Sequence, residues 1–95
     1  MRALLGDTIT ATIPTPAGNP ADLSARIEVP GTRVVVVAGQ PAQQVEFDFT
    51  DEDGWPRTGA HTTVELDSPA AAGEYLICWQ AASTGYESFE PLLVS

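Results

Sequence analysis

The residue types best suited to chemistry in this chain gather around one turn. Four carboxylates stand shortly before Gly54: Asp48, Asp51, Glu52 and Asp53. Several carboxylate oxygens at short range are what Ca²⁺ requires. The spacing of a calcium-binding loop is not met, because with Gly54 as the sixth loop position the twelfth is Ala60, where a bidentate Glu should stand. We therefore predict a solvated hairpin turn without a metal.

Nucleophilic chemistry is also available in principle, because the chain has one histidine, His61, and one cysteine, Cys78. A catalytic thiolate needs an exposed, electropositive setting, whereas Cys78 lies beside Trp79 within an apolar stretch of an acidic protein. A single histidine and a single cysteine cannot supply the ligands of a zinc site. Neither a Gly-x-Ser-x-Gly turn nor a glycine-rich phosphate loop is present. We predict that the protein is not an enzyme and needs no cofactor.

The charge balance narrows the range of partners. Thirteen acidic and 4 basic residues give a net charge of −9, and the arginines are scattered along the chain. Without a basic stripe, binding to nucleic acid is not expected, and the same charge disfavours anionic membrane surfaces. No apolar stretch approaches the roughly 20 residues of a membrane span.

The length of 95 residues predicts one domain, covering residues 1–95. The segment Met1–Leu5 begins like a secretion signal, but Gly6, Asp7 and Thr8 interrupt it before an apolar run of about 7 residues can form. We therefore expect synthesis in a cytoplasm, and the lone cysteine agrees with a reducing compartment.

Hydrophobic periodicity predicts an all-β chain, because apolar residues recur at a period of two and nowhere at helical spacing over three turns. Turn signals separate about seven strands at intervals of about 8 to 12 residues, the spacing of an antiparallel Greek-key sandwich. Gly39 to Pro41 is predicted to end the third strand. The predicted strands cover residues 7–13, 22–29, 32–38, 45–50, 60–66, 73–81 and 86–95.

One core is predicted from the inward positions of these strands. Its members are Tyr75, Ile77, Trp79, Phe47, Phe49, Ile27 and Leu23. The opposite face of the strand at 73–81 carries Leu76 and Cys78, where a solvated strand would have polar residues. Three covers remain open for them: a loop, the N-terminal Leu4 and Leu5, or a partner subunit.

Trp55 is the residue singled out for recognition. It follows Gly54 in a polar turn, and tryptophan is enriched at interface hot spots. The alternative is a ring that folds back over the end of the sandwich. Trp55, Leu76 and Cys78 are together the predicted contacts for a partner protein.

The order of several motifs resembles a known group of proteins. These are a Gly6-Asp7-Thr8 strand start, the Asp51–Gly54 hairpin, and a stretch from Ala70 to Val94 that contains Gly-Glu-Tyr-Leu-Ile-Cys-Trp-Gln and Glu-Ser-Phe-Glu-Pro-Leu-Leu-Val. Together they resemble the small immunoglobulin-like (Ig-like) proteins of tailed bacteriophage virions. These proteins decorate the capsid or lie near the head–tail junction.

The resemblance implies an Ig-like β-sandwich without catalytic residues. Tyr75, Trp79 and Phe89 would be structural residues of its core. The chain departs from the group at Cys78, where a basic residue is common on the outer face.

The resulting functional expectation is a non-catalytic structural virion protein, made in the host cytoplasm. It would be a capsid decoration or head-assembly accessory protein, docked in many copies on a larger shell. One alternative is a head–tail connector, tail or baseplate module. Another is a carbohydrate or cell-surface binding Ig-like module, for which several exposed aromatic residues are expected and only Trp55 and Tyr86 are candidates.

Overall fold

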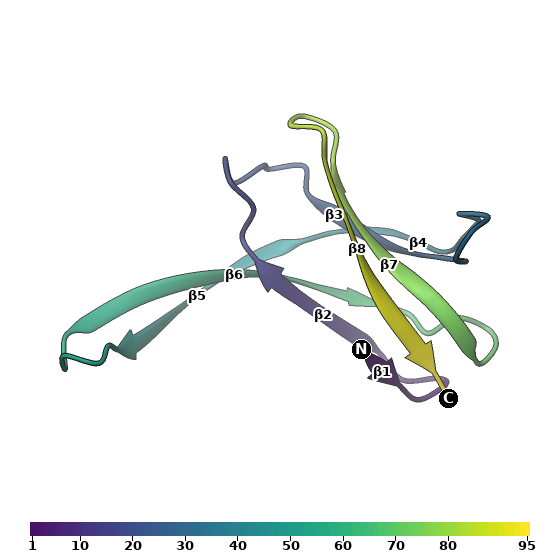
Figure 1. Cartoon of the computed structure of the whole chain (residues 1–95), viewed down its shortest axis with the longest axis horizontal. Helices are drawn as coiled ribbons and strands as arrows, with labels where there is room; N and C mark the ends of the chain where they lie inside the picture. Colours follow the sequence, from purple (N-terminus) through teal and green to yellow (C-terminus); the bar gives the residue numbers. More distant parts are fainter.

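The computed structural model describes residues 1–95 and contains no helix, so no helix is present that could span a membrane. Eight strands form two sheets (Figure 1). The five-stranded sheet has the order β1-β8-β7-β3-β4, and the three-stranded sheet has the order β2-β6-β5. The strands are β1 (Arg2–Ala3), β2 (Ile9–Pro14), β3 (Ser24–Glu28), β4 (Val35–Pro41), β5 (Gln43–Thr50), β6 (Pro56–Leu66), β7 (Gly73–Ala81) and β8 (Tyr86–Val94). The all-β prediction is confirmed.

The strand order is that of an Ig-like sandwich. Strands β8, β7 and β3 correspond to G, F and C of one Ig sheet, and β2, β6 and β5 correspond to B, E and D of the other. At the start of β7 the Tyr75 hydroxyl donates to the Ala71 carbonyl at 2.7 Å, which is the arrangement of a tyrosine corner. The departure from the predicted antiparallel sandwich is β1, which pairs in parallel with β8.

The core lies between the two sheets. Alternation along β3 and β7 directs Ile27 and Trp79 inward, and Ile27 stands opposite Ile77 in the register. The predicted core members Leu23, Ile27, Ile77 and Trp79 are buried, and Tyr75 is partly buried against them. Ile9, Ala11, Val64 and Leu66 close the core from the three-stranded sheet.

The predicted turn at residues 39–41 is wrong. Strand β4 runs through Pro41, and β5 begins at Gln43 after one intervening residue. The Ala42 amide at this junction donates to the Leu23 carbonyl at 2.9 Å. Because β4 is an edge strand, Pro41 can lie in it without breaking the sheet. The chain thus passes from one sheet directly into the other.

Strands β5 and β6 extend beyond the sandwich. β6 pairs with β2 from residue 61 to residue 66, whereas its pairing with β5 starts at Pro56. Residues 44–60, which we call the arm, therefore form a largely two-stranded hairpin, on the left in Figure 1. The molecule measures 46 × 30 × 18 Å with a radius of gyration of 15.0 Å, against about 12 Å for a compact chain of this length.

Candidate docking surface

The register of β5 and β6 gives the arm one apolar face, which we call the aromatic face. Each apolar residue of β5 stands opposite a β6 residue on this same face. The pairs are Val45 with His61, Phe47 with Gly59, and Phe49 with Arg57. The acidic side chains Glu46 and Asp48 alternate with them and project from the other face.

The prediction that Phe47 and Phe49 lie in the core is wrong, because their side chains are 44% and 45% exposed. In the sandwich, β6 directs Val64 and Leu66 inward. Gly59 and the β5 phenylalanines have the opposite parity, so they belong to the outward face. Both phenylalanines belong to the arm, and the arm extends beyond the sandwich on the left in Figure 1.

The aromatic face is organised before any partner binds. The Phe47 ring lies 5.8 Å from the Phe49 ring and 5.5 Å from the His61 ring, measured between centroids. These distances are within the range of favourable aromatic pairs. Gly59 makes the arrangement possible, because a Cβ at that position would lie 2.6 Å from Cζ of Phe47. The ring therefore packs directly over the glycine backbone, as in aromatic rescue of a strand glycine.

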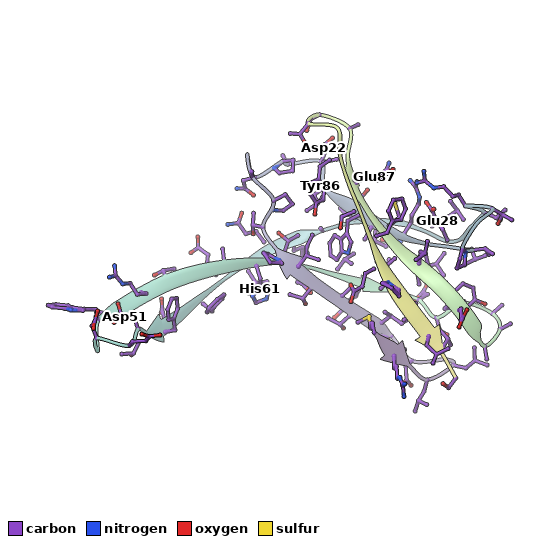
Figure 2. All side chains as sticks on the ribbon, viewed as in Figure 1. Asp22, Glu28, Asp51, His61, Tyr86 and Glu87 are labelled. Carbon is purple, nitrogen blue, oxygen red and sulfur yellow. The ribbon has the colours of Figure 1, made fainter.

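The arm ends in a turn that Asp51 holds together. Its amide donates to the Trp55 carbonyl at 3.0 Å, and its Oδ1 accepts from the amides of Asp53 and Trp55 at 3.0 and 2.9 Å. Arg57 Nε donates to Oδ2 at 2.8 Å. The bonds from Arg57 and from the Trp55 amide lower the pKa of Asp51. Figure 2 labels Asp51 at the far end of the arm.

Trp55 leaves this turn with its side chain 63% exposed. Of the two alternatives left open by the sequence, the ring folded back over the sandwich is therefore excluded. Nor do the acidic residues around it gather: no three His, Cys, Asp or Glu side chains converge as metal ligands would. The turn presents a tryptophan at the tip of the hairpin.

Cys78, unlike Trp55, is covered by other residues of the chain. Its side chain is 0% exposed, and the Arg33 guanidinium lies above it, with Nη2 3.8 Å from Sγ. The same guanidinium stacks on Phe89 at 4.9 Å from the ring centroid. Burial, and then the charge of Glu28, raises the pKa of the thiol. The prediction that Cys78 contacts a partner is wrong, because the loop that carries Arg33 supplies the cover.

Phe89 belongs to this outer cover and is not part of the core implied by the resemblance. It stands opposite Cys78 in the register and is 43% exposed. Ile77 and Trp79 occupy the inward-facing positions of β7. Cys78 and the residue opposite it, Phe89, must therefore lie on the outward face of the sheet.

An ion cluster completes the cover. Glu28 is fully buried and accepts from Arg26 Nε and from Arg33 Nε, the latter at 3.1 Å. Arg33 Nη2 also donates to Glu87 at 3.1 Å. Burial opposes ionisation of Glu28, but the bonds from Arg33 and Arg26 outweigh it and lower the pKa of the carboxyl. Glu28 and Glu87 are labelled together at the right of Figure 2.

Leu76 is partly buried beside a hollow that Met1, Pro30 and Pro91 also line. In Figure 1 the start of β7 and the turn of the arm lie on opposite sides of the molecule. The structure therefore does not bring Leu76 and Trp55 into one surface. The three predicted contacts separate into an exposed tip, a side chain in a hollow and a buried thiol.

Val45, Phe47 and Phe49 were not predicted from the sequence as surface residues. A signal for them was present at Gly59, since an isolated glycine inside a strand pattern often marks a close approach by another group. The glycine falls opposite Phe47 once the hairpin is paired across its turn.

No family model matches this chain, and neither the curated proteins nor the solved structures contain a match to it.

Proposed function

We propose that this protein is a non-catalytic structural component of a virion, which docks in many copies on a larger protein shell through its arm. Capsid decoration or a head-assembly accessory role is the preferred form of this proposal. The observation that carries it is the row of exposed aromatic side chains on a hairpin that leaves the sandwich: Phe47 and Phe49 on one face and Trp55 at the tip.

The arm has the features of a surface that becomes covered. An isolated two-stranded hairpin is marginally stable in water, and fully exposed strand edges are normally protected. Here every residue of β5 is exposed, and β5 pairs with β6 alone. Contact with another protein would both stabilise the two-stranded hairpin and cover the exposed edge of β5.

The apolar area on the arm is large enough to anchor such a contact. Aromatic side chains bury about 150–250 Å² each, so the exposed parts of Phe47, Phe49 and Trp55 amount to roughly 300 Å². At about 25 cal/mol per Å², their burial would contribute roughly 7 kcal/mol before the costs of association. Clusters of this kind dominate the energy of protein interfaces.

The charge of the chain supports a position on the outside of a shell. A net charge of −9 would repel packaged nucleic acid if the protein faced it. The same charge keeps unbound copies apart in the host cytoplasm, where we propose the protein is made.

The test is occupancy on virus particles. Particles produced in the host would be purified on a density gradient, with the chain supplied as wild type or as a Phe47→Ser, Phe49→Ser double variant. We expect the wild type to sediment with the particles and the double variant to be lost from them while it remains folded, with a melting temperature lower by about 10 °C. A Thr10→Ser variant, altered on the sandwich, serves as the matched control.

Two results would count against the proposal in different ways. A wild type that sediments with no particle would reject the virion role, and equal occupancy of the double variant would reject the arm as the contact. Fractionation into heads and tails separates the preferred role from a head–tail connector, tail or baseplate role.

A second candidate is a carbohydrate or cell-surface binding module. It is favoured by the aromatic face, because Phe47, Phe49 and Trp55 exceed the number of exposed aromatics expected from the sequence. Against it, the phenylalanines offer no hydrogen bond to a sugar. Binding of the wild type to an immobilised glycan panel, lost on Trp55→Ala, would favour this candidate over the shell.

A further inference from the structure

The free edge of β5 is the feature that extends the proposed function. β5 is the outer strand of the three-stranded sheet, and its pairing with β6 contains no bulge from Gln43 to Thr50. No other strand of the chain pairs along its outer side. An uninterrupted strand edge of this length is a template for a further strand.

The ladder fixes which backbone groups are free. In an antiparallel pair, residues that bond to the partner strand alternate with residues that point away from it. The bond from the Asp51 amide to the Trp55 carbonyl starts this alternation. Counting from it, the N–H and C=O groups of β5 that point outward belong to the even-numbered residues: Gln44, Glu46, Asp48 and Thr50.

The opposite edge of the arm is less suited to pairing. It is formed by the first part of β6, which starts with Pro56 and Arg57. Proline has no N–H to offer, and charged side chains blunt a strand edge. Only β5 presents both an unbroken row of backbone groups and an apolar face.

Charge decides what kind of strand can pair there. The arm carries five carboxylates against one guanidinium, that of Arg57, which is already paired with Asp51. A second copy would be a poor match, because antiparallel pairing of two β5 strands centred on Phe47 sets Glu46 opposite Asp48 of the other copy, twice. Like charges directly opposite destabilise a sheet.

We infer that β5 takes up an extended segment of the partner protein in which apolar residues alternate with Lys or Arg. This inference rests on the proposed docking function and names its chemistry. The apolar residues of the added strand continue the aromatic face beside Phe47 and Phe49. The basic residues lie on the other face, beside Glu46 and Asp48, and main-chain hydrogen bonds along the edge join the two strands.

The inference is tested with a peptide and the full chain, without any virus particle. The probe is an octapeptide of alternating valine and lysine with blocked ends, and the control replaces each lysine by glutamate. We expect the valine–lysine peptide to bind at least about tenfold more tightly, with an affinity that falls as salt is added. Equal binding of both peptides would overturn the inference.

Backbone pairing has its own readout. Amide hydrogen exchange by NMR should slow at Glu46 and Asp48 when the peptide binds, because only then do these N–H groups find partners. The amides of Phe47 and Phe49 should change little, since they already face β6. Binding without slower exchange at Glu46 and Asp48 would exclude strand addition.

Two pairs of variants complete the design. Glu46→Pro and Glu46→Ala both remove the carboxylate, but only proline removes the outward N–H. We therefore expect the slower exchange at the Asp48 amide to be lost in Glu46→Pro and kept in Glu46→Ala. The Glu46→Lys, Asp48→Lys double variant should prefer the glutamate peptide. Equal binding by the proline and alanine variants would overturn the inference, whereas loss of the Phe47→Ser, Phe49→Ser double variant from particles would still support the docking function.

Discussion

The exposure of Phe47 can be tested by its effect on stability. Complete burial of a phenylalanine side chain stabilises a protein by about 1.5–3 kcal/mol. Because this ring is 44% exposed, Phe47→Ala removes about half of that burial, and water fills the vacated space. We expect the free energy of unfolding to fall by about 1 kcal/mol.

Trp79→Ala is the matched comparison, because its side chain is 0% exposed within the core. Here the lost burial is joined by the cost of a cavity, and we expect a loss of about 3–5 kcal/mol. A domain of this size has a total stability of about 5–14 kcal/mol. The melting temperature should fall by about 5 °C for Phe47→Ala and by about 15–25 °C for Trp79→Ala.

The assay is urea unfolding followed by far-UV circular dichroism, since removal of a tryptophan alters the fluorescence signal. Equal slopes of unfolding free energy against urea would establish that the variants differ in stability alone. A loss above 3 kcal/mol for Phe47→Ala would mean that the ring is buried in solution, and the reasoning about the arm would be refuted.

Three further predictions concern single groups. The pKa of Glu28 is lowered on folding from its ordinary value of 4.5, so the stabilisation from this carboxylate is complete above that pH and is lost as the pH falls below it. The difference in unfolding free energy between wild type and Glu28→Gln should therefore shrink in an acid titration. A difference that grows in acid would contradict this prediction. The Cys78 thiol, buried with a raised pKa, should react with a thiol reagent only as fast as the chain unfolds, and rapid labelling of the native protein would count against the Arg33 cover. Melting curves with calcium, zinc and chelator should coincide, since both carboxylate oxygens of Asp51 already accept hydrogen bonds within the turn. A rise of several degrees in melting temperature with calcium would instead indicate a metal site in the acidic turn.

Much of the sandwich could be predicted from alternation alone. Ile77 and Trp79 share a face at a period of two, flanking turn signals bound their strand, and their burial follows because β7 is central in its sheet. The two-residue β1 could not be predicted, since a strand this short has no periodicity and forms only through its pairing with β8.

The outward position of the β5 phenylalanines could not be predicted from alternation alone. Alternation states that Val45, Phe47 and Phe49 share a face, but it does not state which face meets the core. That choice depends on the register with β6, in which the buried Val64 and Leu66 have the other parity. The reach of the arm depends on where β2 stops pairing, which no local pattern specifies.

The cover of Cys78 depends on tertiary geometry in a similar way. Arg33 has a positive φ of 57°, a conformation uncommon outside glycine. Its guanidinium contacts Glu28, Glu87 and Phe89 at once. The sequence indicated that something must cover Cys78. It did not indicate that an arginine five residues beyond Glu28 would do so.

Photo-crosslinking measures directly whether the tip of the arm touches the partner. A photoreactive p-benzoylphenylalanine would replace Trp55 at the exposed tip, or Glu74 at the exposed start of β7 as a control, in chains assembled onto particles. We expect position 55 to crosslink to one virion protein and position 74 to give no such product. If the position-55 chain is incorporated into particles but gives no crosslink, while position 74 does, the tip of the arm is not the contact.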